Sequence, residues 1–330
     1  MRIIVLAAGQ GSRLRPLTED RPKALVPFLG RPLLDWTITT ARENGLTEVV
    51  VVGGYRSDRL PSGQVQVLNN REYATTSMVS SLMVAEEWFG DGFVMSYGDI
   101  VYRPEVLRAL LASTAEIGVV VDLDWQPYWE RRFGDPLQDA ESLRMTPDRT
   151  IRSIGQTVSR LEDVQAQYIG LVVFRGRGVK ALKRAWVRAK TDAAYRRPIL
   201  GHRTTMARLT MTDVLDELAI SGDVPVKAIP IHGGWVDIDR PEDLPIGEER
   251  WRAGATREVV TEAPAFASPA GVAPAQTGAV AAGGSFGSRA SNGSFSSGGM
   301  GSSGVGSAVG APPALGPLVA PTIFRSNRRW

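Results

Sequence analysis

The chain has 330 residues, 43% of them hydrophobic, so it is long enough to bury at least one large core. The first 253 residues carry 33 charges of each sign, since five of the 38 basic and two of the 35 acidic residues lie beyond them, and this balance speaks against a nucleic-acid partner. With no cysteine and two histidines, the chain has no disulfides or multi-histidine metal sites, and any metal must be held by oxygen ligands.

Strands and helices alternate over the first 121 residues. Continuous aliphatic runs predict buried strands at 2–7, 49–52, 93–96 and 117–121. Proline or serine at the start of three amphipathic segments predicts helices at 32–44, from Ser77, and at 104–113. This alternation predicts an α/β protein with a Rossmann-like, open, mixed and mostly parallel sheet that has helices on both faces.

The second half of the chain has a less regular pattern. Short strands and loops with Trp and Arg begin near residue 124, followed by a strand at 168–174, helices near 179–190 and 212–220, and a last strand and helix over 224–252. We interpret these segments as closing elements of the same domain, 1–252. The remainder, 253–330, is predicted to be a disordered tail, because it is rich in Gly, Ala, Ser and Pro.

A loop of small residues at 7–12, the glycine loop, follows the first strand. Successive backbone amides in such a loop can form an anion-binding nest, and a triphosphate is the obvious guest. Arg13 and Lys23 would hold its negative charge while one bond forms and another breaks. A dinucleotide-binding loop would require a third glycine where Leu14 stands, and the Gly-Lys-Ser/Thr of a P-loop is absent from the sequence.

Carboxylates follow two of the predicted strands. Asp99 stands at the carboxyl end of the strand at 93–96, where ligands bind in open α/β sheets. Asp237 and Asp239 precede the last helix, and one of them is expected to cap it. Because Mg²⁺ prefers one or two carboxylates plus phosphate oxygens, Asp99 with Asp239 or Asp237 is a candidate magnesium site.

These motifs resemble a known family. Leu-Ala-Ala-Gly-x-Gly-x-Arg-Leu-x-Pro-Leu-Thr, starting at Leu6, and Pro-Lys-Ala-Leu, starting at Pro22, are similar to the opening of the nucleotidyltransferase (NTP transferase) family. Segments at 52–55, 76–79, 96–102, 125–141 and 166–170 resemble the bacterial CTP:phosphocholine and phosphoglutamine cytidylyltransferases within it. The resemblance covers about residues 1–250 and implies a fold of the nucleotide-diphospho-sugar transferase type.

The resemblance also implies roles for individual residues. Arg13 and Lys23 would be catalytic and contact phosphates, and Mg²⁺ would be bound by Asp99 with Asp239 or Asp237. The nucleotide-binding residues implied are Leu6, Ala7, Ala8, Gly9, Gly11, Ser12, Arg13, Gly54, Thr76, Ser77 and Gly98. The expected enzyme is therefore a Mg²⁺-dependent nucleotidyltransferase, cytidylyltransferase-like, that transfers CMP from CTP to phosphocholine, phosphoglutamine or a phosphonate and releases pyrophosphate.

The acceptor should be bound by residues of the second half. Aromatic rings can hold a quaternary ammonium through cation–π contact, and arginine beside acids suits an amino-acid-like acceptor. The candidate acceptor-binding residues are Trp125, Trp129, Arg132 and Tyr168, with core packing as the alternative for the two tryptophans. Two other functions remain open: a sugar-1-phosphate nucleotidyltransferase (an NDP-sugar pyrophosphorylase), and a non-catalytic nucleotide-binding regulator.

Location and partners follow from what the sequence lacks. The N-terminus shows no signal-peptide pattern and no apolar stretch approaches the ~18–20 residues that span a bilayer, so a cytoplasmic enzyme of cell-surface polysaccharide or phospholipid precursor biosynthesis is expected. A homodimer is compatible with the sequence. The end of the tail, 323–330, combines apolar and basic residues, so it is either a segment that docks to a protein or membrane surface or an unstructured extension.

Overall fold

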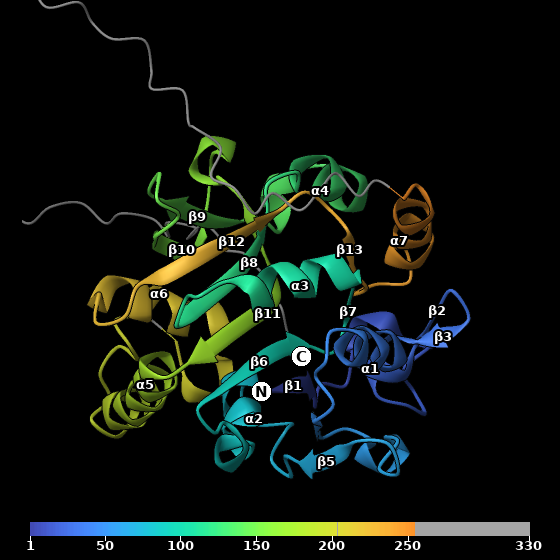
Figure 1. Cartoon of the computed structure of the whole chain (residues 1–330), viewed down its shortest axis with the longest axis horizontal. Helices are drawn as coiled ribbons and strands as arrows, with labels where there is room; N and C mark the ends of the chain where they lie inside the picture. Colours follow the sequence, from blue (N-terminus) through green and yellow to red (C-terminus); the bar gives the residue numbers. More distant parts are fainter. Residues whose placement is uncertain (203, 255–330) are drawn as a thin grey trace, which may run out of the picture. The chain divides into compact units, whose positions relative to one another are not determined.

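The computed structural model describes residues 1–202 and 204–254, which are built around one seven-stranded sheet (Figure 1). The strand order is β12-β8-β11-β6-β1-β4-β5. β11 runs antiparallel to both of its neighbours, and the other four adjacent pairs are parallel. The predicted open, mixed and mostly parallel sheet is therefore confirmed. Its strands are β1 (Arg2–Ala7), β4 (Val49–Gly53), β5 (Gln66–Asn69), β6 (Gly92–Tyr97), β8 (Ile117–Asp122), β11 (Gln167–Arg175) and β12 (Val226–Ile231).

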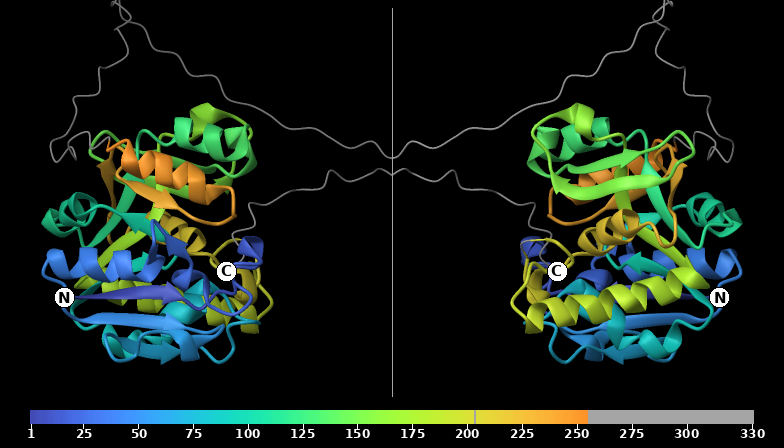
Figure 2. Two further views of the ribbon diagram at one scale, coloured as in Figure 1. Left: turned by 90° about the vertical axis from the view of Figure 1, so that its right-hand side faces the viewer. Right: turned by 90° about the vertical axis from the view of Figure 1, so that its left-hand side faces the viewer.

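Helices cover both faces of the sheet, as predicted. α1 and α3 lie on one side, and α5 and α6 on the other (Figure 2). Strands sandwiched in this way are buried on both faces, which is why their sequences are unbroken aliphatic runs. The helices are α1 (Leu33–Glu43), α2 (Met78–Val84), α3 (Pro104–Ala112), α4 (Gln126–Phe133), α5 (Arg177–Ala194), α6 (Met211–Ser221) and α7 (Asp243–Arg252).

The start of α2 is set by its cap. The Ser77 hydroxyl accepts a hydrogen bond from the Ser80 backbone N–H at 3.1 Å, as the sequence predicts. By contrast, α4 lies where loops and short strands were expected. Its eight residues carry a buried face of Tyr128, Trp129 and Arg132, and a single arginine among two aromatic residues conceals the helical period.

Small two-stranded sheets complete the described part. β7 (Ile100–Tyr102) and β13 (Trp235–Asp237) form an antiparallel pair that brings the Asp99 and Asp237 segments together. Ile238 extends this pairing, since its N–H donates to the Asp99 carbonyl at 3.1 Å. The other two pairs are β2 (Pro27–Phe28) with β3 (Arg31–Pro32), and β9 (Glu141–Met145) with β10 (Ile151–Thr157).

The predicted domain boundary at residue 252 is also the last residue of α7. The predicted disordered tail and its docking end lie outside the described residues, apart from Ala253 and Gly254. Among the helices of residues 1–202 and 204–254, none has the length and apolar character needed to cross a membrane.

Candidate active site

A cleft opens beyond the carboxyl ends of β1 and β6, and it holds about 440 Å³ of space that is continuous with solvent. This is the edge of an open α/β sheet where ligands bind. Residues from four distant segments of the chain meet in it. They are Leu6, Ala7, Gly9, Arg13, Lys23, Ala24, Tyr97, Gly98, Asp99, Asp237 and Asp239.

Two glycines allow the backbone segments of the cleft to approach one another. Gly11 has a φ of +63°, and a Cβ there would lie 2.9 Å from Lys23 Cβ. A Cβ on Gly98 would lie 2.7 Å from the Leu6 carbonyl oxygen, to which the Gly98 N–H donates at 2.9 Å. Both positions therefore require glycine, because any side chain would push the loop away from its neighbours.

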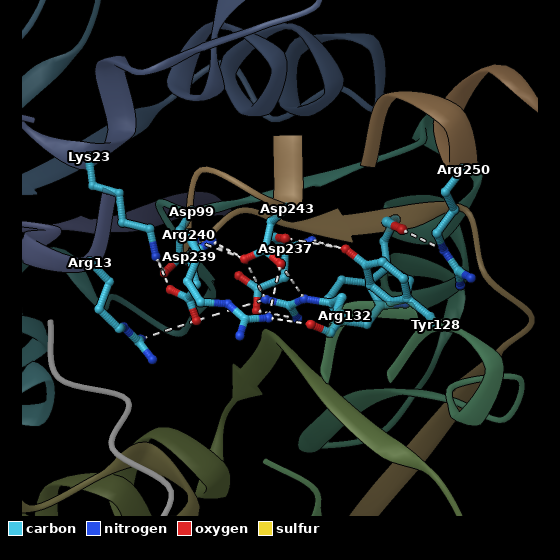
Figure 3. A network of polar contacts seen from close by, with 11 residues as sticks. Arg13, Lys23, Asp99, Tyr128, Arg132, Asp237, Asp239, Arg240, Asp243 and Arg250 are labelled. Carbon is cyan, nitrogen blue, oxygen red and sulfur yellow. Dashed lines mark hydrogen bonds and ion pairs between the residues drawn. The ribbon is translucent and has the colours of Figure 1, made fainter. Parts of the chain in front are cut away.

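Two cations and three acids meet at the floor of the cleft (Figure 3). Lys23 Nζ lies 2.6 Å from Asp99 Oδ2 and also donates to Asp239 Oδ1. Arg13 contacts Asp239 Oδ2 at 3.2 Å. Carboxylate oxygens of Asp99, Asp237 and Asp239 lie within 4.8 Å of one another. The structure thus brings together all five residues predicted to handle phosphate and metal.

The charges at this floor shift one another's pKa values. Burial lowers the pKa of Lys23, but the negative charges of Asp239 and Asp99 outweigh burial, and the pKa is raised. Burial raises the pKa of Asp239, yet Lys23 and Arg13 together hold it below its usual value. Burial and then the neighbouring Asp239 charge raise the pKa of Asp237. Because the pKa of Lys23 is raised and that of Asp239 is lowered, this pair is charged near neutral pH.

The acid cluster has the properties of a divalent-cation site. All three acids are buried, and Asp99 Oδ1 has no hydrogen-bond partner among the described residues. A buried carboxylate oxygen without a partner is costly unless a ligand contacts it. Hard oxygen donors of this kind suit Mg²⁺ rather than softer metals. The residues present therefore fit the predicted magnesium ion.

A fourth acid, Asp243, was missed as a site residue by sequence reasoning. Arg132 donates to it twice, at 2.9 and 3.0 Å, and to Asp237 at 3.0 Å. The expectation that Asp237 or Asp239 caps the last helix is wrong. α7 begins at Asp243, behind Glu242, without a side-chain cap. The sequence signal for this role of Asp243 was its place among the acids Asp239, Glu242 and Asp243 that flank Pro241.

The predicted acceptor-binding residues lie in different surroundings. Trp129 is 0% and Trp125 4% exposed, and their rings pack edge to face at 6.0 Å, which is the core-packing alternative. Arg132 is buried in the ion pairs just described, and it does not line the cleft. Tyr168 packs edge to face at 5.7 Å on Tyr97, which does line it.

A second cleft adjoins the first and shares Leu6 and Gly9 with it. Predicted nucleotide-binding residues Ala8, Thr76 and Ser77 line this cleft, together with Tyr73, Met78 and Ser81, which were not predicted to bind the nucleotide. Gly54 lies behind it, since a Cβ there would be 2.7 Å from the Ala8 carbonyl. Ser12 is exposed on the 3₁₀ turn Ser12–Leu14 and lines neither cleft.

Known proteins are similar to this chain in sequence and in fold. Residues 3–160 match the MobA-like NTP transferase domain. The chain is 32% identical over 261 residues to CTP:phosphoglutamine cytidylyltransferase of Campylobacter jejuni, covering 76% of this chain and 100% of that protein. It is 25% identical over 271 residues to UTP–glucose-1-phosphate uridylyltransferase of Haloferax volcanii, covering 78% and 99%.

CTP:phosphocholine cytidylyltransferase from Streptococcus pneumoniae has the same fold, with a TM-score of 0.55 at 20% identity over 75% of this chain and 97% of that one. The fold and the cleft therefore define a nucleotidyltransferase. The chain belongs to the NTP transferase family that includes the bacterial cytidylyltransferases. The predicted family and the nucleotide-diphospho-sugar transferase type of fold are both confirmed.

Proposed function

We propose that this nucleotidyltransferase is Mg²⁺-dependent and transfers CMP from CTP to a small phosphorylated acceptor, such as phosphocholine, phosphoglutamine or a phosphonate. The observation that carries the proposal is the meeting of Arg13, Lys23 and three buried carboxylates beside the glycine loop. Nucleotidyl transfer needs cations that bind the phosphates and carboxylates that bind a metal ion, and the cleft contains both.

The two adjoining clefts suggest how the nucleotide lies. The triphosphate would follow the loop from Gly9 to Arg13, where backbone amides and the guanidinium are available. The base would enter the second cleft, whose small polar side chains include Thr76 and Ser77. Their hydroxyls can donate and accept hydrogen bonds, as recognition of a pyrimidine edge requires.

Bound Mg²⁺ would neutralise phosphate charge and orient the phosphate oxygens. The Lys23 ammonium lies between Asp99 and Asp239. When a nucleotide and metal enter together, Lys23 and Arg13 can exchange carboxylate for phosphate oxygens, which keeps the buried charges paired. Binding of metal and nucleotide is therefore expected to be cooperative.

The chemical step needs no general base from the protein. An acceptor phosphate is largely dianionic at neutral pH because its second pKa is about 6, so its oxygen can attack the α-phosphorus directly. The new bond joins that oxygen to the α-phosphorus, while the bond from the α-phosphorus to the bridging oxygen breaks and pyrophosphate leaves. Lys23 would stabilise charge on the α-phosphate, and Arg13 would hold the leaving pyrophosphate.

The acceptor is the open part of the proposal. The sequence identity of 32% with the Campylobacter jejuni enzyme, whose name specifies phosphoglutamine, supports an amino-acid-like acceptor. A sugar 1-phosphate is the second candidate, supported by the Haloferax volcanii uridylyltransferase. Tyr97 lines the cleft with Tyr168 packed behind it, and this aromatic wall is where an acceptor's organic group could lie.

The deciding experiment tests CTP, UTP, GTP and ATP, each with phosphocholine, phosphoglutamine, 2-aminoethylphosphonate and glucose 1-phosphate, by pyrophosphate release. We expect turnover with CTP and one of the first three acceptors, and its loss in EDTA. Turnover with UTP and glucose 1-phosphate alone would support the sugar alternative. Nucleotide binding without pyrophosphate release from any pair would support a non-catalytic regulator.

A further inference from the structure

We infer that Arg132 is a positioning residue of the metal site: it keeps Asp237 in an internal ion pair and, through Asp243, fixes the turn that presents Asp239 to the cleft. This inference rests on the proposed metal-dependent transfer. It assigns different roles to two acids that stand two residues apart and that sequence reasoning left as alternatives.

Arg132 lies on the other side of Asp239 from Lys23 and Arg13 (Figure 3). Its side chain is 0% exposed, and its guanidinium carbon lies 5.0 to 5.5 Å from the ring centres of Tyr128, Trp129 and Phe133 on the same helix. At these distances, aromatic rings attract a guanidinium through cation–π contact. Arg132 therefore cannot turn toward a substrate in the cleft without leaving both its rings and its acids.

The three nitrogens of the Arg132 guanidinium bind Asp237 and Asp243 but not Asp239. Nη1 binds Asp237 at 3.0 Å, whereas Nε and Nη2 bind the two oxygens of Asp243. The distance from Nη2 to Asp239 is 4.0 Å, which is beyond hydrogen-bond length. Asp239 instead faces Lys23 and Arg13, the two cations that line the cleft.

Asp243 transmits this arrangement to the backbone. Besides both bonds from Arg132, its carboxylate accepts hydrogen bonds from the N–H groups of Asp239 at 2.9 Å and Arg240 at 2.8 Å. Arg240 also binds α4 directly, since its guanidinium donates to the Arg132 carbonyl at 2.7 Å. The turn that carries Asp239 is thereby tied to α4 at both ends, as a metal ligand's supporting shell should be.

This arrangement favours Asp99 and Asp239 as the metal ligands. Magnesium is usually held by one or two carboxylates together with substrate phosphates, so a third is not required. If Asp237 were a ligand, its carboxylate would have to be shared between the metal and the fully buried guanidinium of Arg132, and this would weaken a buried ion pair. Asp237 would instead remain paired with Arg132, whose positive charge offsets that of the acid.

The inference can be tested with Mn²⁺ as the probe, by measuring its binding to the full chain with and without CTP by electron paramagnetic resonance. Asp239→Asn should weaken Mn²⁺ binding in the presence of CTP by at least about 10-fold, whereas Asp237→Asn should change it by less than about 3-fold. Arg132→Lys should weaken it by about 10- to 100-fold, since lysine cannot bridge Asp237 and Asp243.

Arg131→Lys is the matched control, because Arg131 is the preceding residue of α4 but is exposed and bound to Glu249. It should bind Mn²⁺ as the wild type does. CTP binding in EDTA separates positioning of the metal site from general damage: Arg132→Lys should leave it within about 3-fold, while a merely structural defect would lower both affinities together.

The inference is overturned if Asp237→Asn loses Mn²⁺ binding as completely as Asp239→Asn, or if Arg132→Lys binds Mn²⁺ normally. Should Arg132→Lys fail to fold, the comparison of the two isosteric aspartate variants still decides. The proposed function fails separately, when the wild-type chain neither binds Mn²⁺ with CTP nor releases pyrophosphate. Wild-type turnover with equal effects of both aspartate variants would contradict the inference about Arg132 alone.

Discussion

Replacement of Lys23 by glutamine removes the cation between two buried acids. Lys23 is 12% exposed and lies 2.6 Å from Asp99, which is also 12% exposed, and it contacts Asp239, which is 10% exposed. Breaking a buried ion pair by removing one partner costs about 3–5 kcal/mol. For a domain of this size, each kcal/mol shifts the melting temperature by about 2–4 °C, so Lys23→Gln should melt about 6–20 °C lower in EDTA.

A divalent cation should reverse much of this loss. In Lys23→Gln, Mg²⁺ or Mn²⁺ can enter between Asp99 and Asp239 without displacing an ammonium, so metal alone should stabilise the variant more than the wild type. At a concentration 100 times its dissociation constant, the metal adds about 2.7 kcal/mol, which corresponds to about 5–11 °C. Turnover should nevertheless stay about 10²- to 10³-fold below wild type, because the cation at the reacting phosphate is missing.

Thermal melts followed by circular dichroism, in EDTA and then in increasing metal, measure both effects. Arg15→Gln is the control, since Arg15 is an exposed cation of the same loop and its loss should move neither melting temperature. The reasoning is refuted if Lys23→Gln melts like the wild type in EDTA, or if metal raises the melting temperatures of the two proteins equally.

Three further changes test other parts of the structure. Asp99→Asn should lower pyrophosphate release by about 100-fold or more, because it removes a proposed metal ligand worth several kcal/mol; near-normal turnover would contradict this. Gly98→Ala should lower the free energy of unfolding in urea by about 1–3 kcal/mol, since its Cβ meets the Leu6 carbonyl at 2.7 Å, and an unchanged value would mean that the loop can move aside. Trp129→Phe should lower the free energy of unfolding, but by less than the about 3–5 kcal/mol expected for a Trp→Ala change. It should leave the KM for the acceptor unchanged. A selective rise in that KM would instead support Trp129 as an acceptor-binding residue.

The local features of this protein were readable from its sequence. The unbroken aliphatic runs at 2–7, 49–52, 93–96 and 117–121 predicted buried strands, because a strand covered on both faces has no polar side. Serine at position 77 predicted the start of α2. The run of small residues after the first strand predicted the loop that lines the cleft together with Arg13 and Lys23. Each of these inferences depends only on residues close together in the chain.

The partners of distant residues were decided by the tertiary structure. Pairing of β7 with β13 brings Asp99 beside Asp237 and Asp239, and no local pattern encodes that pairing. Arg132 was predicted to bind the acceptor, but arginine beside aromatic residues is found both in binding sites and in buried ion pairs. Only packing of α4 against the turn before α7 distinguishes the two, since burial of a charge depends on what surrounds it in space.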